Sequence, residues 1–152
     1  MTIETDSELV AGLRTAFTAE AMTAQRFTYF AMLADIEGYP EVACLFAEMA
    51  ESVACAAHGH VDWLQHVADP STGDPIGDTE LNLAASLAGE LQEASRLYPA
   101  LAEAARGDGL SDVASWFDTV RALKMAHVEK LQRALDHLIA RRPAARTGGA
   151  RP

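Results

Sequence analysis

The chain has 152 residues and a mass of 16.3 kDa, a size that suits one compact domain. Hydrophobic residues make up 49% and charged residues 22% of the sequence, which excludes a wholly disordered chain. All 22 acidic residues but only eight of the 12 basic ones lie in residues 1–140. We expect no nucleic-acid partner, because binding to a phosphate backbone depends on many Lys and Arg contacts.

The same sequence gives no sign of a membrane protein. No apolar run approaches the roughly 20 residues of a membrane span. The first eight residues lack the basic and apolar blocks of a signal peptide. We therefore expect a cytoplasmic protein with no membrane partner.

Two helices are predicted in the first half of the chain. The pair Thr5 and Glu8 forms a capping box, and apolar residues then recur every three or four positions until a stop at 38–40. Pro40 stands in the first turn of a second helix, whose apolar stripe ends before residue 69.

The only two cysteines, Cys44 and Cys55, fall on this second helix. Their eleven-residue separation corresponds to roughly 16 Å along a helix axis, too far for a disulfide. We expect both to be small buried apolar residues.

The second half begins with a loop over residues 69–78, rich in Pro, Gly and Asp. Asp78 or Thr79 can cap a third helix that runs to residue 106, and Pro99 should bend this helix or loosen one of its turns. A fourth helix, capped by Ser111, follows up to residue 140. Residues 141–152 have no apolar periodicity and are predicted to be a disordered basic tail.

Two short connections and one long one favour two helical hairpins joined by a crossover loop. This is the all-α, ferritin-like four-helix bundle, here occupying residues 1–140. The halves also echo each other at an offset of 70 or 71 residues, as in Glu20 with Glu90 and Phe46 with Phe117. Bundles of this kind build a metal site from a Glu and a Glu-x-x-His in each hairpin.

Five polar residues interrupt the predicted inward stripes or lie beside them. They are Glu20, Glu90, Glu93, Lys124 and His127. Burying any one of these charges alone would cost several kcal/mol, so we expect them to face one another or a bound ion. The competing interpretation is that the charged side chains rotate to the edges of their helices and reach solvent. In that interpretation His127 is an ordinary histidine of the core.

Other histidines and aromatic residues carry weaker signals. His60 continues the stripe of the second helix and could reach the edge of the site, whereas His58 and His66 are predicted on the surface. Phe27 and Tyr98 occupy equivalent places in the two halves and are predicted in the core.

Several strings spread along the chain are specific enough to suggest a family. They include Ala16-Phe17-Thr18-Ala19-Glu20, Arg26-Phe27-Thr28-Tyr29-Phe30-Ala31, Thr72-Gly73-Asp74-Pro75-Ile76-Gly77-Asp78-Thr79, Gly89-Glu90-x-x-Glu93, Tyr98-Pro99 and Trp116-Phe117. Through these strings the chain resembles the rubrerythrins over roughly residues 8–138, and it is most similar to the short sulerythrin-like branch without a rubredoxin domain. The resemblance implies a ferritin-like fold with a non-haem di-iron site that reduces peroxide.

The resemblance also implies a ligand set. Glu20, Glu90, Glu93 and His127 match the family pattern of metal ligands, and Tyr98 matches a site tyrosine. Three ligand positions depart from the pattern. The Glu-x-x-His of the second helix reads Val53-x-x-Ala56, and that of the fourth helix begins with Lys124. The site tyrosine of the first helix is Phe27.

These departures predict a degenerate site. Val53 and Ala56 have no donor atom, and a protonated Lys124 would place a positive charge where a metal belongs. We therefore expect no normal di-iron centre, and either no metal or a single Fe or Mn ion.

Three functions stay open at this point. The first is a metal-independent or weakly metal-binding enzyme that acts on a small molecule through Glu20, Glu90, Glu93, Lys124, His127 and Tyr98, with Lys124 as electrostatic partner or as amine nucleophile. The second is an oxidoreductase with one metal on Glu20, Glu90, Glu93 and His127. The third is a non-catalytic structural or partner subunit. In each case a homodimer is expected.

Overall fold

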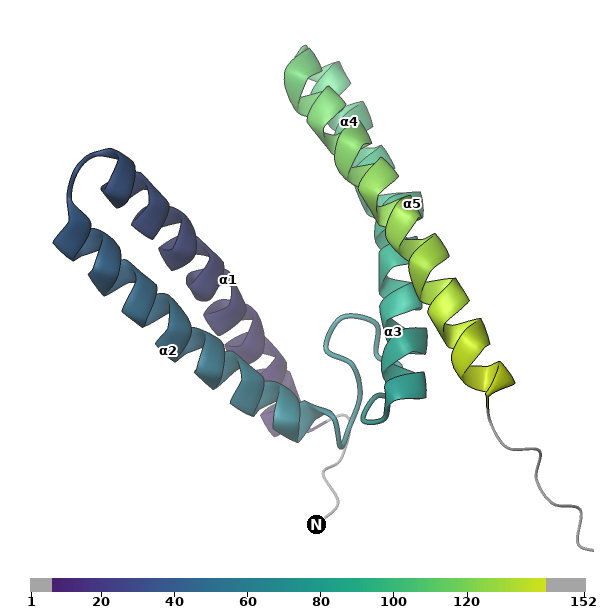
Figure 1. Cartoon of the computed structure of the whole chain (residues 1–152). Coiled ribbons are helices and arrows are strands. Elements are labelled where there is room, and N and C mark those ends of the chain that lie inside the picture. Colours follow the sequence, from purple (N-terminus) through teal and green to yellow (C-terminus); the bar gives the residue numbers. More distant parts are fainter. Residues whose placement is uncertain (1–6, 142–152) are drawn as a thin grey trace, which may run out of the picture. The chain divides into compact units, whose positions relative to one another are not determined.

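The computed structural model describes residues 7–141 and shows helices joined by turns and loops (Figure 1). The elements are α1 (Glu8–Ile36), α2 (Pro40–Leu64), α3 (Thr79–Gln92), the π-helical segment η1 (Glu93–Leu97), α4 (Tyr98–Gly107) and α5 (Ser111–Ala140). The chain divides into two compact units, Met1–Gly77 and Asp78–Pro152, and each contains one helical hairpin. The predicted all-α class built from two hairpins is confirmed.

The first hairpin consists of α1 and α2. Ser7, rather than the predicted Thr5, caps α1: its side chain accepts a hydrogen bond from the Val10 backbone N–H at 3.3 Å. Thr5 itself lies outside the described residues. Pro40 opens α2 in its first turn, as predicted, because its missing N–H costs nothing there. The helices pack through aromatic rings, with Phe46 between Phe27 and Phe30 at centroid distances of 5.7 and 5.6 Å.

The loop between the hairpins begins after Leu64, three residues before the end of the predicted apolar stripe. Asp69 organises the loop, since its Oδ1 accepts hydrogen bonds from the backbone N–H groups of Ser71 and Thr72 at 2.8 and 2.7 Å. Asp78 then caps α3 by accepting a hydrogen bond from the Leu81 N–H at 2.9 Å. That cap was one of the two predicted.

The second hairpin packs α3, η1 and α4 against α5. Pro99 has the predicted effect, because the five residues Glu93–Leu97 widen into a π turn just before it. The predicted Ser111 cap is wrong. Ser111 is the first residue of α5, Leu110 precedes it as the cap residue, and no side chain caps this end.

The two hairpins turn in the same way. Gly38 and Gly109 both adopt positive φ, 84° and 74°. The next N–H in each, from Tyr39 or Leu110, reaches back five residues at 2.8 Å. These matches, and the Phe27–Phe46 and Tyr98–Phe117 ring pairs, share an offset of 71 residues.

The π segment explains why the offset is 70 at Glu20 and Glu90 but 71 from Phe27 and Tyr98 onward. A π turn holds more residues than an α turn, so one residue can be inserted without shifting the flanking turns. The one-residue difference between the repeats falls between Glu90 and Tyr98, where η1 lies.

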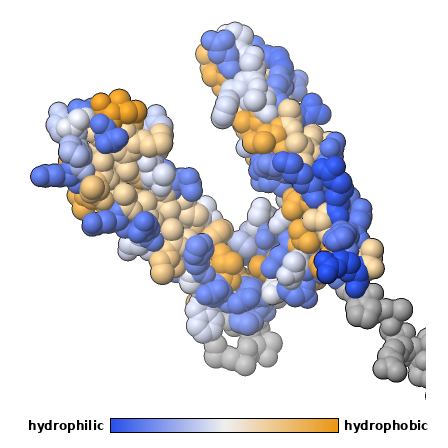
Figure 2. All heavy atoms as spheres, in the orientation of Figure 1, coloured by the Kyte–Doolittle hydropathy of each residue, from blue (hydrophilic) through white to orange (hydrophobic). Residues whose placement is uncertain are grey.

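Small side chains dominate the buried set. Ten of its 12 hydrophobic members are alanines, and Leu64 and Val10 are the largest fully buried side chains. Larger apolar side chains lie on the surface of each hairpin (Figure 2). The prediction for the cysteines is wrong, because Cys44 and Cys55 are free and exposed. Apart from Arg141, the predicted disordered tail lies outside the described residues.

Candidate functional site

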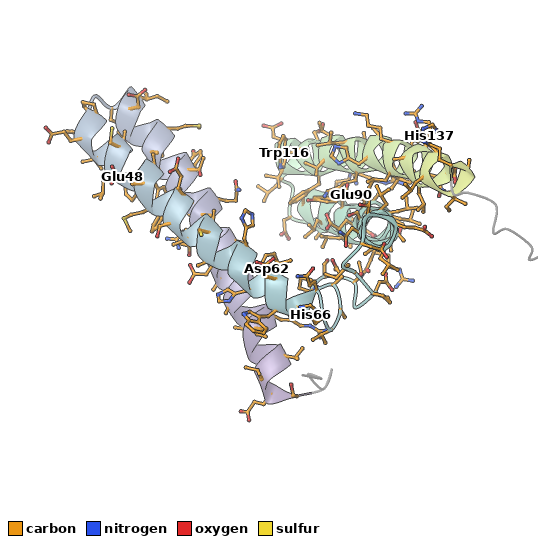
Figure 3. All side chains as sticks on the ribbon, turned by 60° about the horizontal axis from the view of Figure 1, so that its bottom comes forward. Glu48, Asp62, His66, Glu90, Trp116 and His137 are labelled. Carbon is orange, nitrogen blue, oxygen red and sulfur yellow. The ribbon has the colours of Figure 1, made fainter. Side chains whose placement is uncertain are left out.

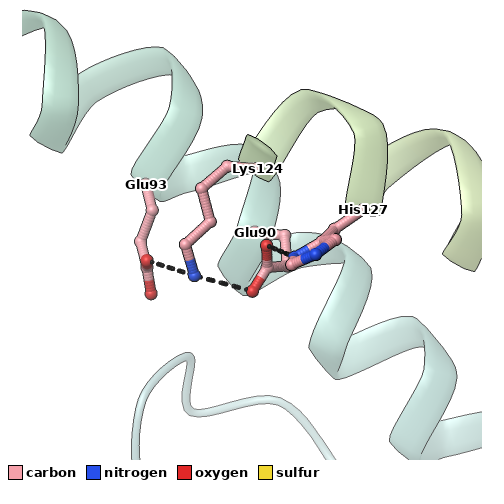
Figure 4. A network of polar contacts seen from close by, with 4 residues as sticks. All are labelled: Glu90, Glu93, Lys124 and His127. Carbon is pink, nitrogen blue, oxygen red and sulfur yellow. Dashed lines mark hydrogen bonds and ion pairs between the residues drawn. The ribbon is translucent and has the colours of Figure 1, made fainter. Parts of the chain in front are cut away.

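Four of the predicted polar residues meet where α3 and η1 face α5 in the second hairpin, and we call them the Lys124 cluster (Figure 4). Lys124 Nζ lies 2.8 Å from Glu90 Oε1 and 2.9 Å from Glu93 Oε2. His127 Nδ1 lies 3.0 Å from Glu90 Oε2. The ammonium group thus stands between two carboxylates, one of which also holds the imidazole.

Helix periodicity produces this arrangement. Glu90 on α3 and Glu93 at the start of η1 are three residues apart, and so are Lys124 and His127 on α5. Residues three apart lie on the same face of a helix, so two facing helices bring the pairs together. Figure 3 shows Glu90 on α3 beside α5, between the ends of α5 marked by Trp116 and His137.

Burial and ion pairing act together on the charges. The side chains of Lys124 and Glu90 are 19% and 21% exposed. Burial alone would raise the pKa of Glu90, but hydrogen bonds from Lys124 and His127, with their charges, bring that pKa below its ordinary 4.5. Burial would likewise lower the pKa of Lys124, but the two carboxylates raise it above its ordinary 10.5. Both members of the pair are charged at neutral pH.

These charge states assign two roles. An ionised Glu90 can only accept hydrogen bonds, so His127 donates through Nδ1 and its Nε2 is left for another proton or ligand. A carboxylate that orients an imidazole in this way is typical of acid–base sites. The predicted use of Lys124 as an amine nucleophile is not favoured, because it required a lowered pKa and the pKa is raised.

The other two predicted site residues, Glu20 and Tyr98, make no hydrogen bond or ion pair with the Lys124 cluster among the contacts that the described residues show. Glu20 is half-buried on α1 in the first hairpin, so its place in the site stays a prediction. Tyr98 is half-buried against Phe117, with ring centroids 6.3 Å apart, as the core interpretation predicts.

The histidines of α2 follow their predictions in part. His58 and His66 are exposed, as predicted. His60 is half-buried in the first hairpin, and its predicted approach to the site edge stays a prediction. Figure 3 marks Glu48, Asp62 and His66 along this helix.

Arg121 is a residue that sequence reasoning missed. It lies one turn before Lys124 on α5, and its Nε donates a hydrogen bond to the backbone oxygen of Ala94 at 3.1 Å. The available signal was its spacing, since Arg121, Lys124 and His127 are three residues apart in turn.

Two features of the residues bear on the predicted loss of a di-iron centre, which stays a prediction. Val53 and Ala56 offer no donor atom on α2, and the Lys124 ammonium group lies within hydrogen-bond distance of the two carboxylates that would bind metal. Among the described residues no group of three or more His, Cys, Asp or Glu side chains is arranged to hold a metal ion.

Known proteins are similar to this chain over most of its length. A sequence profile described as rubrerythrin matches residues 12–69. Rubrerythrin from Porphyromonas gingivalis is 32% identical over 127 residues, which are 81% of this chain and 64% of that protein. Rubrerythrin-2 from Clostridium acetobutylicum is 30% identical over 129 residues, 82% of this chain and 70% of that protein. The chain belongs to the rubrerythrin family.

This rubrerythrin-family chain spans about two thirds of the length of these relatives. A third relative, rubrerythrin from Nitratidesulfovibrio vulgaris, is 29% identical over 76% of the chain and 63% of its own length. The predicted family membership is therefore confirmed. In the described part of the chain no helix combines the length and apolar content that crossing a membrane requires.

Proposed function

We propose that this chain is a metal-independent member of the rubrerythrin family, in which the Lys124 ammonium group takes the place of a metal ion between two carboxylates. The observation that carries the proposal is the pair of contacts from Nζ to Glu90 and Glu93 at 2.8 and 2.9 Å. One positive charge already offsets much of the negative charge there, and both carboxylates gain a donor.

The proposed chemistry is acid–base catalysis on a small molecule, with His127 as the acid–base group. Glu90 orients the imidazole through Nδ1, which leaves Nε2 to take or give a proton. Lys124 keeps Glu90 ionised and so fixes the tautomer of His127. Glu93, whose side chain is 34% exposed, supplies a second carboxylate near the same surface. A homodimer and a small-molecule substrate belong to this proposal.

One observation favours a second candidate, an oxidoreductase with a single Fe or Mn ion. Glu90, Glu93 and His127 all belong to one hairpin, so displacement of the ammonium group would leave three donor side chains close together. Family membership supports iron binding. The two candidates differ in whether a metal competes successfully with Lys124.

Paramagnetic NMR separates them. Mn(II) added to the protein in the absence of oxygen broadens the signals of side chains close to its binding site. The metal-independent proposal predicts that one equivalent of Mn(II) leaves the His127 ring and the Glu93 carboxyl signals no broader than those of Glu48, a matched exposed carboxylate on α2. Selective loss of the His127 and Glu93 signals would establish the metal site instead.

A further inference from the structure

The π turn beside the Lys124 cluster takes the usual helical donor away from the backbone oxygen of Ala94. In a regular α-helix, the Ala94 oxygen would accept from the N–H of Tyr98. Here the Tyr98 N–H donates to Glu93, five residues earlier. The next N–H along the chain would belong to Pro99, which has none.

A side chain from the opposite helix fills that position. Arg121 Nε on α5 donates to the Ala94 oxygen at 3.1 Å. Ala94 is completely buried, so water could not easily serve as the donor. Pro99 therefore creates the need for an outside donor, and Arg121 meets it.

This hydrogen bond acts where the cluster is assembled. Glu93 is the first residue of the π turn, and its carboxylate reaches Lys124, which lies three residues after Arg121 on α5. Arg121 thus ties the backbone next to Glu93 to the same stretch of helix that carries the ammonium group.

We propose that Arg121 is a positioning residue, which holds the π turn against α5 so that the Glu93 carboxylate meets Lys124. The inference deepens the proposed function, because it concerns the geometry of the same cluster. It also makes Pro99 and Arg121 a dependent pair: an N–H at position 99 could serve the Ala94 oxygen and make Arg121 dispensable.

A double-mutant cycle on the full chain tests the dependence. The variants are Arg121→Ala, Pro99→Ala and the two combined, with Arg133→Ala as a matched control on the exposed surface of α5. The readouts are the exchange rate of the Lys124 ammonium protons with water and the chemical shift of the Glu93 carboxyl carbon at pH 7, which report the contact rather than overall folding.

In Arg121→Ala we expect the ammonium protons of Lys124 to exchange with water about tenfold faster, the factor that corresponds to the loss of one hydrogen bond of ordinary strength. We also expect the chemical shift of the Glu93 carboxyl carbon to move toward that of an exposed carboxylate. In the combined variant both readouts should return most of the way to those of Pro99→Ala, and Arg133→Ala should change neither.

Two results would overturn the inference: an unchanged contact in Arg121→Ala, or an equally large change whether or not Pro99 is present. If Arg121→Ala does not fold, the combined variant decides. A folded protein with the Glu93–Lys124 contact supports the dependence, and an unfolded one contradicts it. Metal binding by the unaltered protein would defeat the proposed function while leaving the coupling of Arg121 and Pro99 intact, so the two failures are distinguishable.

Discussion

The two hairpins have the same backbone turn and the same aromatic packing, but they carry different side chains at the positions of the Lys124 cluster. Both turn at a positive-φ glycine and pack an aromatic pair at the same offset. At the positions related by 71 residues, the first hairpin has Val53 and Ala56 where the second has Lys124 and His127.

The π turn belongs to the second hairpin alone among the described residues. Its first residue, Glu93, supplies the second carboxylate of the cluster. The fold of each hairpin therefore depends on the repeated turn and packing residues. The ion pairs depend instead on charged side chains that contact one another within the second hairpin.

Removal of the ammonium group should have the largest effect on stability. Lys124→Met leaves two carboxylates close together without their shared cation. The side chains of Lys124 and Glu90 keep about a fifth of their exposure to solvent. We therefore expect the free energy of unfolding to fall by about 2 kcal/mol, which is less than for a fully buried ion pair. Urea unfolding of Lys124→Met beside Lys130→Met, the other lysine and exposed on the same helix, measures it. Equal losses in the two variants would contradict the account.

The stabilisation by the ion pair of Lys124 and Glu90 should be lost both at low pH and at high pH. Glu90 has a lowered pKa, so its contribution to the free energy of unfolding is fully present above pH 4.5 and is lost as the pH falls below that value. Lys124 has a raised pKa, so its part is present below pH 10.5 and is lost as the pH rises further.

The difference in unfolding free energy between the unaltered chain and Lys124→Met should therefore form a plateau from about pH 5 to 10 and shrink on both sides. Unfolding curves at a series of pH values test this. A difference that changes within this range would contradict the assignment of the stabilisation to Glu90 and Lys124.

Substitution of the turn glycines should lower the stability of both hairpins by similar amounts, and by less than Lys124→Met does. Gly38→Ala and Gly109→Ala each force a side chain into positive φ, which costs about 1 kcal/mol. Gly12→Ala, in a helix with open space around the new carbon, should instead stabilise by about 0.5–1 kcal/mol. Thermal unfolding of the three variants measures both effects. A large difference between the two turn variants would show that the repeats do not share one turn.

Much of this organisation was predictable from the sequence. Apolar spacing with Gly38, Pro40 and Gly109 gives the two hairpins, and Pro99 gives the irregular turn, because these residues act through local backbone geometry. The contact of Lys124 with Glu90 and Glu93 was one of two expectations from the sequence, since residues three apart share a helix face but could also have turned to solvent.

Other features depend on contacts that no local pattern specifies. The cap by Ser7 competes with an equally good candidate two residues earlier, and only the finished helix end selects between them. The link from Arg121 to Ala94 depends on a carbonyl that the π turn leaves without a donor, which a regular helical pattern does not reveal. The exposure of Cys44 and Cys55 depends on the rotation of α2 against α1, which periodicity fixes only approximately.

The metal content per chain, measured by elemental analysis after anaerobic loading with Fe(II) and desalting, shows whether Lys124 excludes a metal from the cluster. We expect almost no iron in the unaltered protein, because Lys124 holds the carboxylates. We expect about two irons in the variant Val53→Glu/Ala56→His/Lys124→Glu, which restores the family's ligand types. One or two irons per unaltered chain would contradict the claim that the ammonium group replaces the metal.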